Sequence, residues 1–210
     1  MVAKDPNQCW GEEILKKLIP DMKEEEEFLK QLKKFGVVIK DIQGVIISHS
    51  HADHAGAIDH FRDTGIPICF QGKELEQVLK NLESGMKTYG PLDSDEIRRG
   101  LNLSLIDGVY DLFGNGEVVI FPTPGHTLGH QSLMIKRKSQ GPLIFCADAC
   151  YTMKNLEQEI PQGLTEDMNQ HVLTLRSLKV MKMMGAEIIP GHDLAYFDKR
   201  PMAPDSIFTG

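Results

Sequence analysis

Short apolar runs alternate with amphipathic stretches along the chain. GVIIS, at 44–48, is an apolar and β-branched run that is typical of a buried strand. Phe28, Leu32 and Phe35 recur at helical spacing and form one apolar stripe. The segment 168–184 has apolar residues around much of its circumference, which predicts a well-buried helix. This alternation indicates an α/β domain in which helices pack on sheets. The predicted strands are 44–48, 117–122, 131–137, 142–147 and 186–190, and the predicted helices are 21–36, 55–61, 73–83, 93–100 and 168–184.

Histidine and aspartate gather where four of these strands end. HSHADH follows the strand at 44–48, and TPGHTLGH follows the strand at 117–122. Asp148 comes directly after the strand at 142–147, and the strand at 186–190 runs into GHD. Loops at strand ends are held by a rigid sheet and are a common place for a functional site.

Composition places the chain among globular proteins. Its 210 residues predict a single domain, 1–210. With 41% hydrophobic and 25% charged residues, whole-chain disorder, collagen and coiled coil are excluded. The net charge of −7, from 23 basic and 30 acidic residues, argues against a dedicated nucleic-acid binder, so no nucleic-acid partner is predicted.

The same features predict a cytoplasmic protein. No window holds the ~18 consecutive apolar residues of a membrane span, and the first residues show no signal-peptide pattern. The four cysteines form no C-x-x-C pair and are predicted to be reduced thiols. The sequence does not define the oligomeric state, and a homodimer is one alternative.

Seven residues of metal-ligand type lie at the strand ends. Four of them fall within six consecutive positions, whereas a lone loop histidine is more often structural. Imidazole nitrogen and carboxylate oxygen suit zinc, and also iron or manganese. Seven ligands are too many for one tetrahedral ion and suit two ions that share a bridging carboxylate. The candidate ligands are His49, His51, Asp53, His54, His126, Asp148 and His192.

These motifs resemble those of a known superfamily. HSHADH matches the H-x-H-x-D-H motif of the metallo-β-lactamase superfamily. TPGHTLGHQS, DACYT and PGHD, in this order, resemble the later motifs of its N-acyl-homoserine lactonases, the quorum-quenching lactonases. The resemblance runs from about Trp10 to near the C-terminus. It implies the α/β fold of that superfamily, a four-layer αβ/βα sandwich.

The resemblance also implies a ligand set and a reaction. Two zinc ions are expected, although the same ligands also fit iron, manganese or cobalt. The implied enzyme is a metal-dependent hydrolase of carboxylic esters that opens the lactone ring of N-acyl-homoserine lactones, small-molecule substrates, by attack of metal-bound hydroxide. By resemblance, His49, His51 and His126 hold one ion, Asp53, His54 and His192 hold the other, and Asp148 bridges both.

Two residues have implied catalytic roles. Tyr151, three residues after Asp148, matches the family tyrosine that helps to bind the substrate carbonyl. The alternative for Tyr151 is a packed structural tyrosine. Asp53 is placed by the resemblance to deliver a proton to the leaving alkoxide.

Other histidines and aromatic residues carry less information. His130 matches a motif histidine that is not a ligand and is expected to shape its loop. His60 and His171 match nothing in the family and are expected to be incidental. Met86, Tyr89 and Phe113 could line a substrate pocket or pack in the core.

Other branches of the superfamily fit less well. The commonest zinc β-lactamases have a cysteine where Asp148 stands. Glyoxalase II-like thioesterases share the ligand set but carry a sizeable C-terminal segment, and the segment after His192 is short. Another lactone, ester or thioester hydrolase, or an inactive member that only binds metal, remains an alternative.

The N-terminal part departs from the family pattern. Family members begin with several strands that end in a D-T-G segment, whereas only residues 1–48 precede His49 and they contain no D-T-G. The resemblance therefore predicts that about 50 residues of N-terminal strands are absent. An exposed sheet edge would follow. The corresponding hypotheses are a fragment, a misplaced start codon, or a protein that a partner completes.

Overall fold

A computed structural model describes Lys16, residues 23–86 and residues 90–200. The chain divides into two compact units. The first comprises Met1–Phe70 and Leu75–Leu105, and the second comprises Gln71–Glu74 and Ile106–Gly210.

A three-stranded sheet organises the first unit. Its order is β1 (Val45–Ile46), β2 (Pro67–Gln71) and β3 (Asn102–Ile106). β1 runs parallel to β2, with Val45 opposite Ile68. The predicted strand at 44–48 is confirmed in a shorter form, whereas β2 and β3 were not predicted. The strand β2 is buried along most of its length, as its run of Ile, Cys and Phe requires.

Short helices surround this sheet. The predicted single helix at 55–61 is wrong, because the chain forms α3 and η3 with Gly56 as the C-cap of α3. The predicted helix at 21–36 is shorter than expected, because Glu27 has extended backbone (ψ 140°) and α2 starts after it; residues 21 and 22 lie outside the described residues. The helices up to Leu105 are η1 (Glu24–Glu26), α2 (Phe28–Lys34), η2 (Ile39–Asp41), α3 (Ala52–Ala55), η3 (Ile58–Phe61), α4 (Gly72–Glu83), η4 (Pro91–Asp93) and α5 (Asp95–Arg99).

The core of the first unit is apolar and continuous. It joins the strand residues to α3, η3 and α4, and Phe28 of α2 packs against it. The predicted helices at 73–83 and 93–100 are confirmed as α4 and α5. The buried core residues are Ile47, Ala55, Ile58, Phe61, Ile68, Phe70, Val78, Leu92 and Leu101.

A five-stranded sheet organises the second unit, in the order β4-β5-β6-β7-β8. The strands β4 to β7 pair antiparallel, and β7 pairs parallel with β8. Ile144 of β7 lies opposite Met134 and Ile188. The four strands predicted in this part are confirmed, and β4 was not predicted. The bounds are β4 (Tyr110–Asp111), β5 (Val118–Pro122), β6 (Gln131–Ile135), β7 (Leu143–Phe145) and β8 (Glu187–Ile189).

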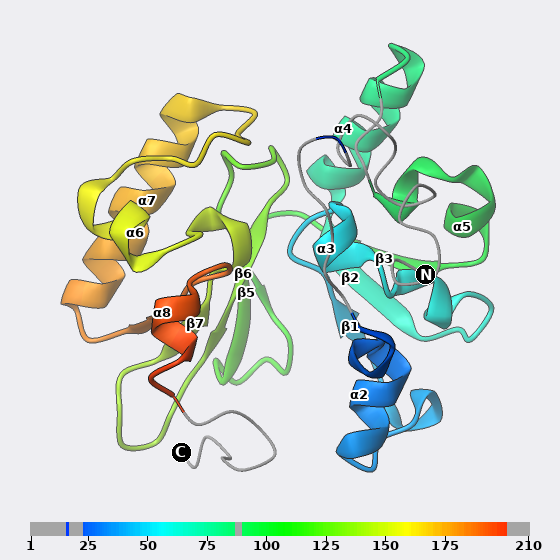
Figure 1. Ribbon diagram of the computed structural model, residues 1–210, viewed down its shortest axis with the longest axis horizontal. Helices are drawn as coiled ribbons and strands as arrows, with labels where there is room; N and C mark the ends of the chain where they lie inside the picture. The colour runs from blue at the N-terminus through cyan, green and yellow to red at the C-terminus, as the bar shows by residue number, and fades with distance from the viewer. Residues whose placement is uncertain (1–15, 17–22, 87–89, 201–210) are drawn as a thin grey trace. The chain divides into compact units, whose positions relative to one another are not determined.

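The helices α6 (Met153–Gln158) and α7 (Met168–Met183) pack against one another beside this sheet (Figure 1). Two short elements follow strands of the sheet, η5 (Ala147–Ala149) and α8 (Leu194–Phe197). Leu156 of α6 and Leu175 and Leu178 of α7 contact the sheet in an apolar core. The other buried members of this core are Ile144, Cys146, Ala149, Cys150, Ala186 and Ile188.

The burial of α7 differs from the prediction. The helix exists as predicted, but within it only His171, Thr174, Leu175 and Leu178 are buried. Its opposite side leaves Val180 about half exposed (52%). The prediction of a well-buried helix is wrong, because one face alone meets the sheet and the apolar residues elsewhere on the circumference face outward.

Three thiols, those of Cys69, Cys146 and Cys150, are free and buried. Burial raises the pKa of the Cys146 thiol. Cys9 lies outside the described residues. Among the residues that the structure describes, no helix has the length and apolar character needed to cross a membrane.

Candidate metal centre

The first unit carries the HSHADH motif on the turn between β1 and α3. The sheet pairing ends just before this turn, where the Ile47 amide donates to the Cys69 carbonyl at 3.0 Å. His51 is the N-cap of α3, so Asp53 and His54 lie in its first helical turn. Strand end and helix start therefore place four ligand-type side chains on one short turn.

Within this turn the side chains form two pairs. His49 Nε2 lies 3.0 Å from His51 Nδ1. His54 Nε2 lies 3.4 Å from Asp53 Oδ2. Ser48 Oγ lies 3.1 Å from His49 Nδ1 and 3.5 Å from His54 Nδ1, so it contacts the second nitrogen of both rings. The ligand atoms of each pair are within 4.8 Å of one another, close enough to share an ion. His49, His51, Asp53 and His54 are called the first cluster below.

The second unit carries the other three candidate ligands, which are called the second cluster. His126 follows β5, Asp148 lies in η5 after β7, and His192 follows β8. His126 Nε2 lies 3.2 Å from Asp148 Oδ2. His192 Nε2 lies 3.1 Å from Asp148 Oδ1. The two oxygens of one buried carboxylate therefore face two different imidazoles, which is the arrangement that a bridging ligand needs.

The hydrogen bonds of His126 define which of its nitrogens faces the carboxylate. His126 Nδ1 lies 2.6 Å from the Leu164 carbonyl oxygen. A carbonyl only accepts, so Nδ1 carries the proton and donates it. A neutral ring then presents the lone pair of Nε2 to Asp148 Oδ2, and two acceptors at 3.2 Å repel unless a cation lies between them. A second proton or a metal ion supplies that cation, so this donor set fits a divalent metal ion.

Tyr151 lies beside both histidines of the second cluster. Its ring centroid is 4.8 Å from that of His192 and 5.7 Å from that of His126. The Tyr151 carbonyl accepts a 2.9 Å hydrogen bond from the His192 amide, and the Cys150 carbonyl accepts one of 2.9 Å from the Gly191 amide. These two backbone hydrogen bonds join the loops after β7 and β8, and the ring contacts place the Tyr151 side chain beside the ligand side chains.

His171 has a structural role that the sequence did not predict. It is fully buried, and its Nε2 lies 3.0 Å from the Ala149 carbonyl while its Nδ1 lies 3.1 Å from Thr165 Oγ1. Burial lowers the pKa of His171, although the hydrogen bond to Ala149 opposes this effect. The expectation that His171 is incidental is therefore wrong. His130 is also buried, with its Nδ1 2.8 Å from Thr123 Oγ1 at the base of the His126 loop.

Two of the three residues predicted either to line a substrate pocket or to pack in the core lie within the described part of the chain, and both are exposed. Met86 and Phe113 are 57% and 65% exposed, so neither packs in a core. Tyr89 lies outside the described residues. His60 stacks on Phe28, with ring centroids 5.9 Å apart.

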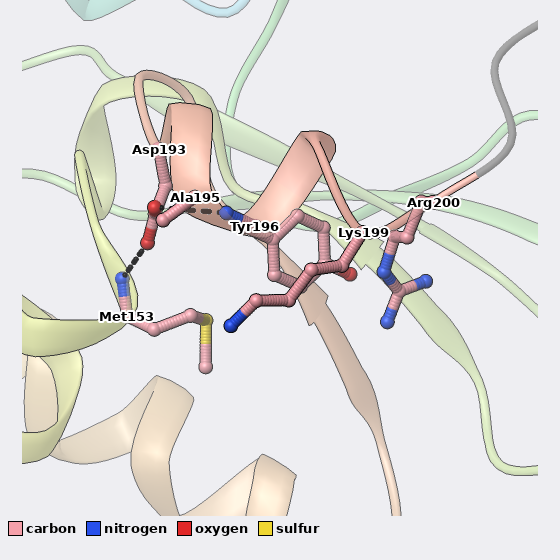
Figure 2. Close-up of a pocket in the computed structure, with 6 residues that line it drawn as sticks. All are labelled: Met153, Asp193, Ala195, Tyr196, Lys199 and Arg200. Carbon is pink, nitrogen blue, oxygen red and sulfur yellow. Dashed lines mark hydrogen bonds between the residues drawn. The ribbon is translucent and has the colours of Figure 1, made fainter.

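A separate pocket of about 600 Å³ lies next to α8 in the second unit (Figure 2). The Asp193 carboxylate accepts hydrogen bonds from the amides of Met153 and Tyr196, at 2.8 and 3.1 Å. Arg200 pairs with Glu187 and stacks on the Tyr196 ring. The polar and charged groups at this pocket therefore mainly form hydrogen bonds and ion pairs with one another. The lining residues are Met153, Asp193, Ala195, Tyr196, Lys199 and Arg200.

The fold and the two clusters define a class of protein. The family model of the metallo-β-lactamase superfamily matches residues 20–192. The chain belongs to this superfamily, and the predicted α/β fold of the superfamily is confirmed; the structure contains two sheets.

Within the superfamily the chain is similar to N-acyl homoserine lactonases. It is 33% identical over 199 residues to N-acyl homoserine lactonase AttM of Azorhizobium caulinodans, covering 91% of this chain and 73% of the relative. It is 34% identical over 182 residues to N-acyl homoserine lactonase AiiA of Bacillus thuringiensis subsp. kurstaki, covering 84% of this chain and 66% of the relative. The chain thus spans about two thirds to three quarters of these two relatives.

A solved structure supports the same similarity. It is an N-acyl homoserine lactone hydrolase with the product N-hexanoyl-L-homoserine bound at its catalytic metal centre. The two chains share 31% identity and a TM-score of 0.75, over 88% of this chain and 69% of the other.

Proposed function

We propose that this protein is a metal-dependent hydrolase that opens the lactone ring of N-acyl-homoserine lactones. The observation that carries the proposal is the Asp148 carboxylate, whose two oxygens face His126 and His192 at 3.2 and 3.1 Å. The similarity to lactonases supports the choice of substrate class. The protein is proposed to act as a single domain in the cytoplasm, where the free thiols of Cys69, Cys146 and Cys150 would persist.

Both clusters are proposed to supply ligands to two ions, with zinc as the expected metal. When bound, two divalent ions supply Lewis acidity and produce a nucleophile from water at neutral pH. Asp148 is suited to the bridging position, because it is the carboxylate with both oxygens directed at histidines. The proposed groups are His49, His51 and His126 for one ion and Asp53, His54 and His192 for the other.

Two side chains of this chain are proposed to act on the substrate itself. The Tyr151 hydroxyl would donate a hydrogen bond to the lactone carbonyl oxygen as negative charge develops there. The packing of its ring against His192 supports this role, because it restricts the tyrosine to the side of the second cluster. Asp53 would accept the proton that the attacking water gives up and deliver it to the ring oxygen as it leaves. Its side chain is 38% exposed and can exchange protons with water. The overall reaction adds one water across the ester C–O bond and gives an acyl-homoserine.

The first test compares Asp148→Ala with the unchanged protein. Removal of the bridging carboxylate should release most of the bound metal and abolish lactone hydrolysis. Metal per chain is measured by elemental analysis, and hydrolysis of N-hexanoyl-homoserine lactone by proton release. Two ions with no turnover in the unchanged protein would identify a metal-binding member without this activity. Full activity in Asp148→Ala would refute the dinuclear site.

The second test separates catalysis from metal binding. Tyr151→Phe should retain both ions and raise the barrier by about 1–3 kcal/mol, or roughly 5- to 150-fold in kcat. Tyr196→Phe is the matched control, because the Tyr196 hydroxyl contacts Glu187 on another part of the unit and its loss should leave kcat unchanged. Equal kcat values for the two variants would show that Tyr151 is a packing residue. Light scattering on the same samples would determine whether the protein is a homodimer.

A further inference from the structure

We infer that Gln162 is a positioning residue of the metal centre. Its side chain and the segment around it fix the positions of the loops that carry His126 and Asp148. The inference rests on the function proposed above, and it concerns residues that do not themselves bind metal. Gln162 lies between α6 and α7, in the segment 162–167, which is called the clamp. The clamp contacts two of the three ligand loops of the second unit, those that carry His126 and Asp148.

The Gln162 side chain makes the most direct link. It is 93% buried, and its Nε2 donates to the Asp148 carbonyl at 2.5 Å. The same nitrogen lies 3.3 Å from His126 Nδ1, but Nδ1 donates to the Leu164 carbonyl, so this approach of two donors is a packing contact and not a hydrogen bond. The carbonyl of Asp148 only accepts, so the amide must turn its nitrogen toward it. One side chain therefore holds the Asp148 backbone by a hydrogen bond and packs beside His126, which is 22 positions from Asp148 in the sequence.

The backbone of the clamp holds the His126 loop. The Leu164 carbonyl accepts from His126 Nδ1 at 2.6 Å and keeps Nε2 directed at Asp148. The Glu166 amide donates to the His126 carbonyl at 3.1 Å, and the Asp167 amide donates to the Gly125 carbonyl at 2.9 Å. Because the carbonyl of Leu164 sets the orientation of the ring, a shift of the clamp would turn His126 Nε2 away from Asp148.

Thr165 closes the clamp on its other side. Its Oγ1 donates to the Gln162 carbonyl at 2.9 Å and lies 3.1 Å from His171 Nδ1. His171 Nε2 in turn contacts the Ala149 carbonyl, next to Asp148, at 3.0 Å. The Asp148 loop is thus held at two successive carbonyls, one by Gln162 and one by His171.

The expected consequence is a change in metal affinity. Loss of a polar group that orients a ligand typically lowers metal affinity about 10- to 100-fold. Gln162→Met removes the donor and replaces the amide with a flexible apolar side chain of similar length. We therefore expect a 10- to 100-fold weaker affinity for at least one of the two ions. The control is Gln158→Met, because Gln158 is exposed on α6 and its replacement should change the affinity less than twofold.

The experiment is a zinc titration of the metal-free full chain in competition with a chromophoric chelator. The absorption spectrum of the cobalt-loaded protein gives a second readout, because a reoriented His126 changes the ligand field, which a general loss of stability would not do. Thr165→Val removes the hydroxyl that closes the clamp and serves as the second variant if Gln162→Met fails to fold. It is expected to weaken zinc binding in the same direction.

The outcomes separate this inference from the proposed function. If the unchanged protein binds no zinc, the proposed metal centre is wrong and the inference falls with it. A second outcome refutes the positioning role alone. In that outcome the unchanged protein binds two ions, and Gln162→Met (or Thr165→Val in its place) binds both with affinities within twofold of those of the unchanged protein and shows the same cobalt spectrum. Weaker binding with an altered cobalt spectrum in the variant, and neither change in Gln158→Met, supports it.

Discussion

A methyl group at position 125 would collide with the helix that supports the second cluster. Gly125 has φ +134°, in a region that side chains rarely adopt. A Cβ built there would lie 2.4 Å from His171 Cα, 2.5 Å from its Cβ and 2.6 Å from its backbone nitrogen. These contacts involve backbone of α7, so no side-chain rotation relieves them. Gly125→Ala therefore requires a movement of α7 or of the loop that carries His126.

The cost has two parts. Overpacking a closed site costs about 1–3 kcal/mol. A non-glycine residue held in a sparsely populated backbone region costs a further ~1–3 kcal/mol. The free energy of unfolding should fall by about 2–6 kcal/mol in total. Because His126 is the next residue and His171 contacts Ala149, the same shift should weaken zinc binding.

Urea unfolding of the metal-free protein measures the effect. Gly163→Ala is the control, because a Cβ there meets nothing within 4 Å and φ is not in the positive region. Alanine at this position should leave stability nearly unchanged or raise it by about 0.4–1 kcal/mol, through the lower entropy of the unfolded chain. Equal unfolding free energies for Gly125→Ala and Gly163→Ala would refute the reasoning.

Three further predictions concern packing, pH and metal. Leu175→Ala, in the core of the second unit, should lower the free energy of unfolding by about 2–5 kcal/mol. The control Leu173→Ala, on the exposed side of the same helix (53% exposed), should change it by less than ~1 kcal/mol. Similar urea midpoints for the two variants would contradict the assignment of Leu175 to the core. Burial would raise the pKa of Glu187, but hydrogen bonds from Arg200 and Arg137 outweigh it and hold that pKa below its ordinary value. Its stabilisation is thus present above about pH 4.3 and lost as pH falls through the folded-state pKa, so Glu187→Gln should lose less unfolding free energy than the unchanged protein between about pH 5 and pH 3. Chelation of bound metal should lower the Tm, because a ligand at about 100 times its Kd adds ~2.7 kcal/mol to the free energy of unfolding. An unchanged Tm after verified metal removal would show that the folded and unfolded chains bind metal equally.

The apolar runs in the sequence, and the ligand-type residues that follow them, predicted much of the architecture around the two clusters. Short runs rich in apolar and β-branched residues identified β1, β5, β6, β7 and β8, because such runs bounded by turn residues are typical of strands. The histidines and aspartates then followed at the strand ends, where each unit gathers its own cluster. β2, β3 and β4 were missed, because short strands beside helix-like segments cannot be separated from them by periodicity alone.

The supporting residues could not be predicted in the same way. Gln162 and His171 act through the carbonyls of Asp148 and Ala149, and a backbone carbonyl carries no residue identity that a sequence pattern could reveal. Their partners are also 14 and 22 residues away. The clamp has no recognisable motif of its own, whereas HSHADH concentrates its ligands in one short turn.

Asp148 explains why the second cluster needs this support. Its side chain is 2% exposed and its oxygens face two imidazole nitrogens, so positive charge close to it must offset the cost of burying the carboxylate. Metal ions provide that charge only if His126 and His192 both keep their nitrogens directed at the carboxylate. The clamp directs the first of these rings through the Leu164 carbonyl, and the hydrogen bond between the Tyr151 carbonyl and the His192 amide fixes the backbone of the second. The hydrogen bonds around Asp148 are therefore directed at ligand geometry, and substitutions within them should alter metal affinity more than global stability.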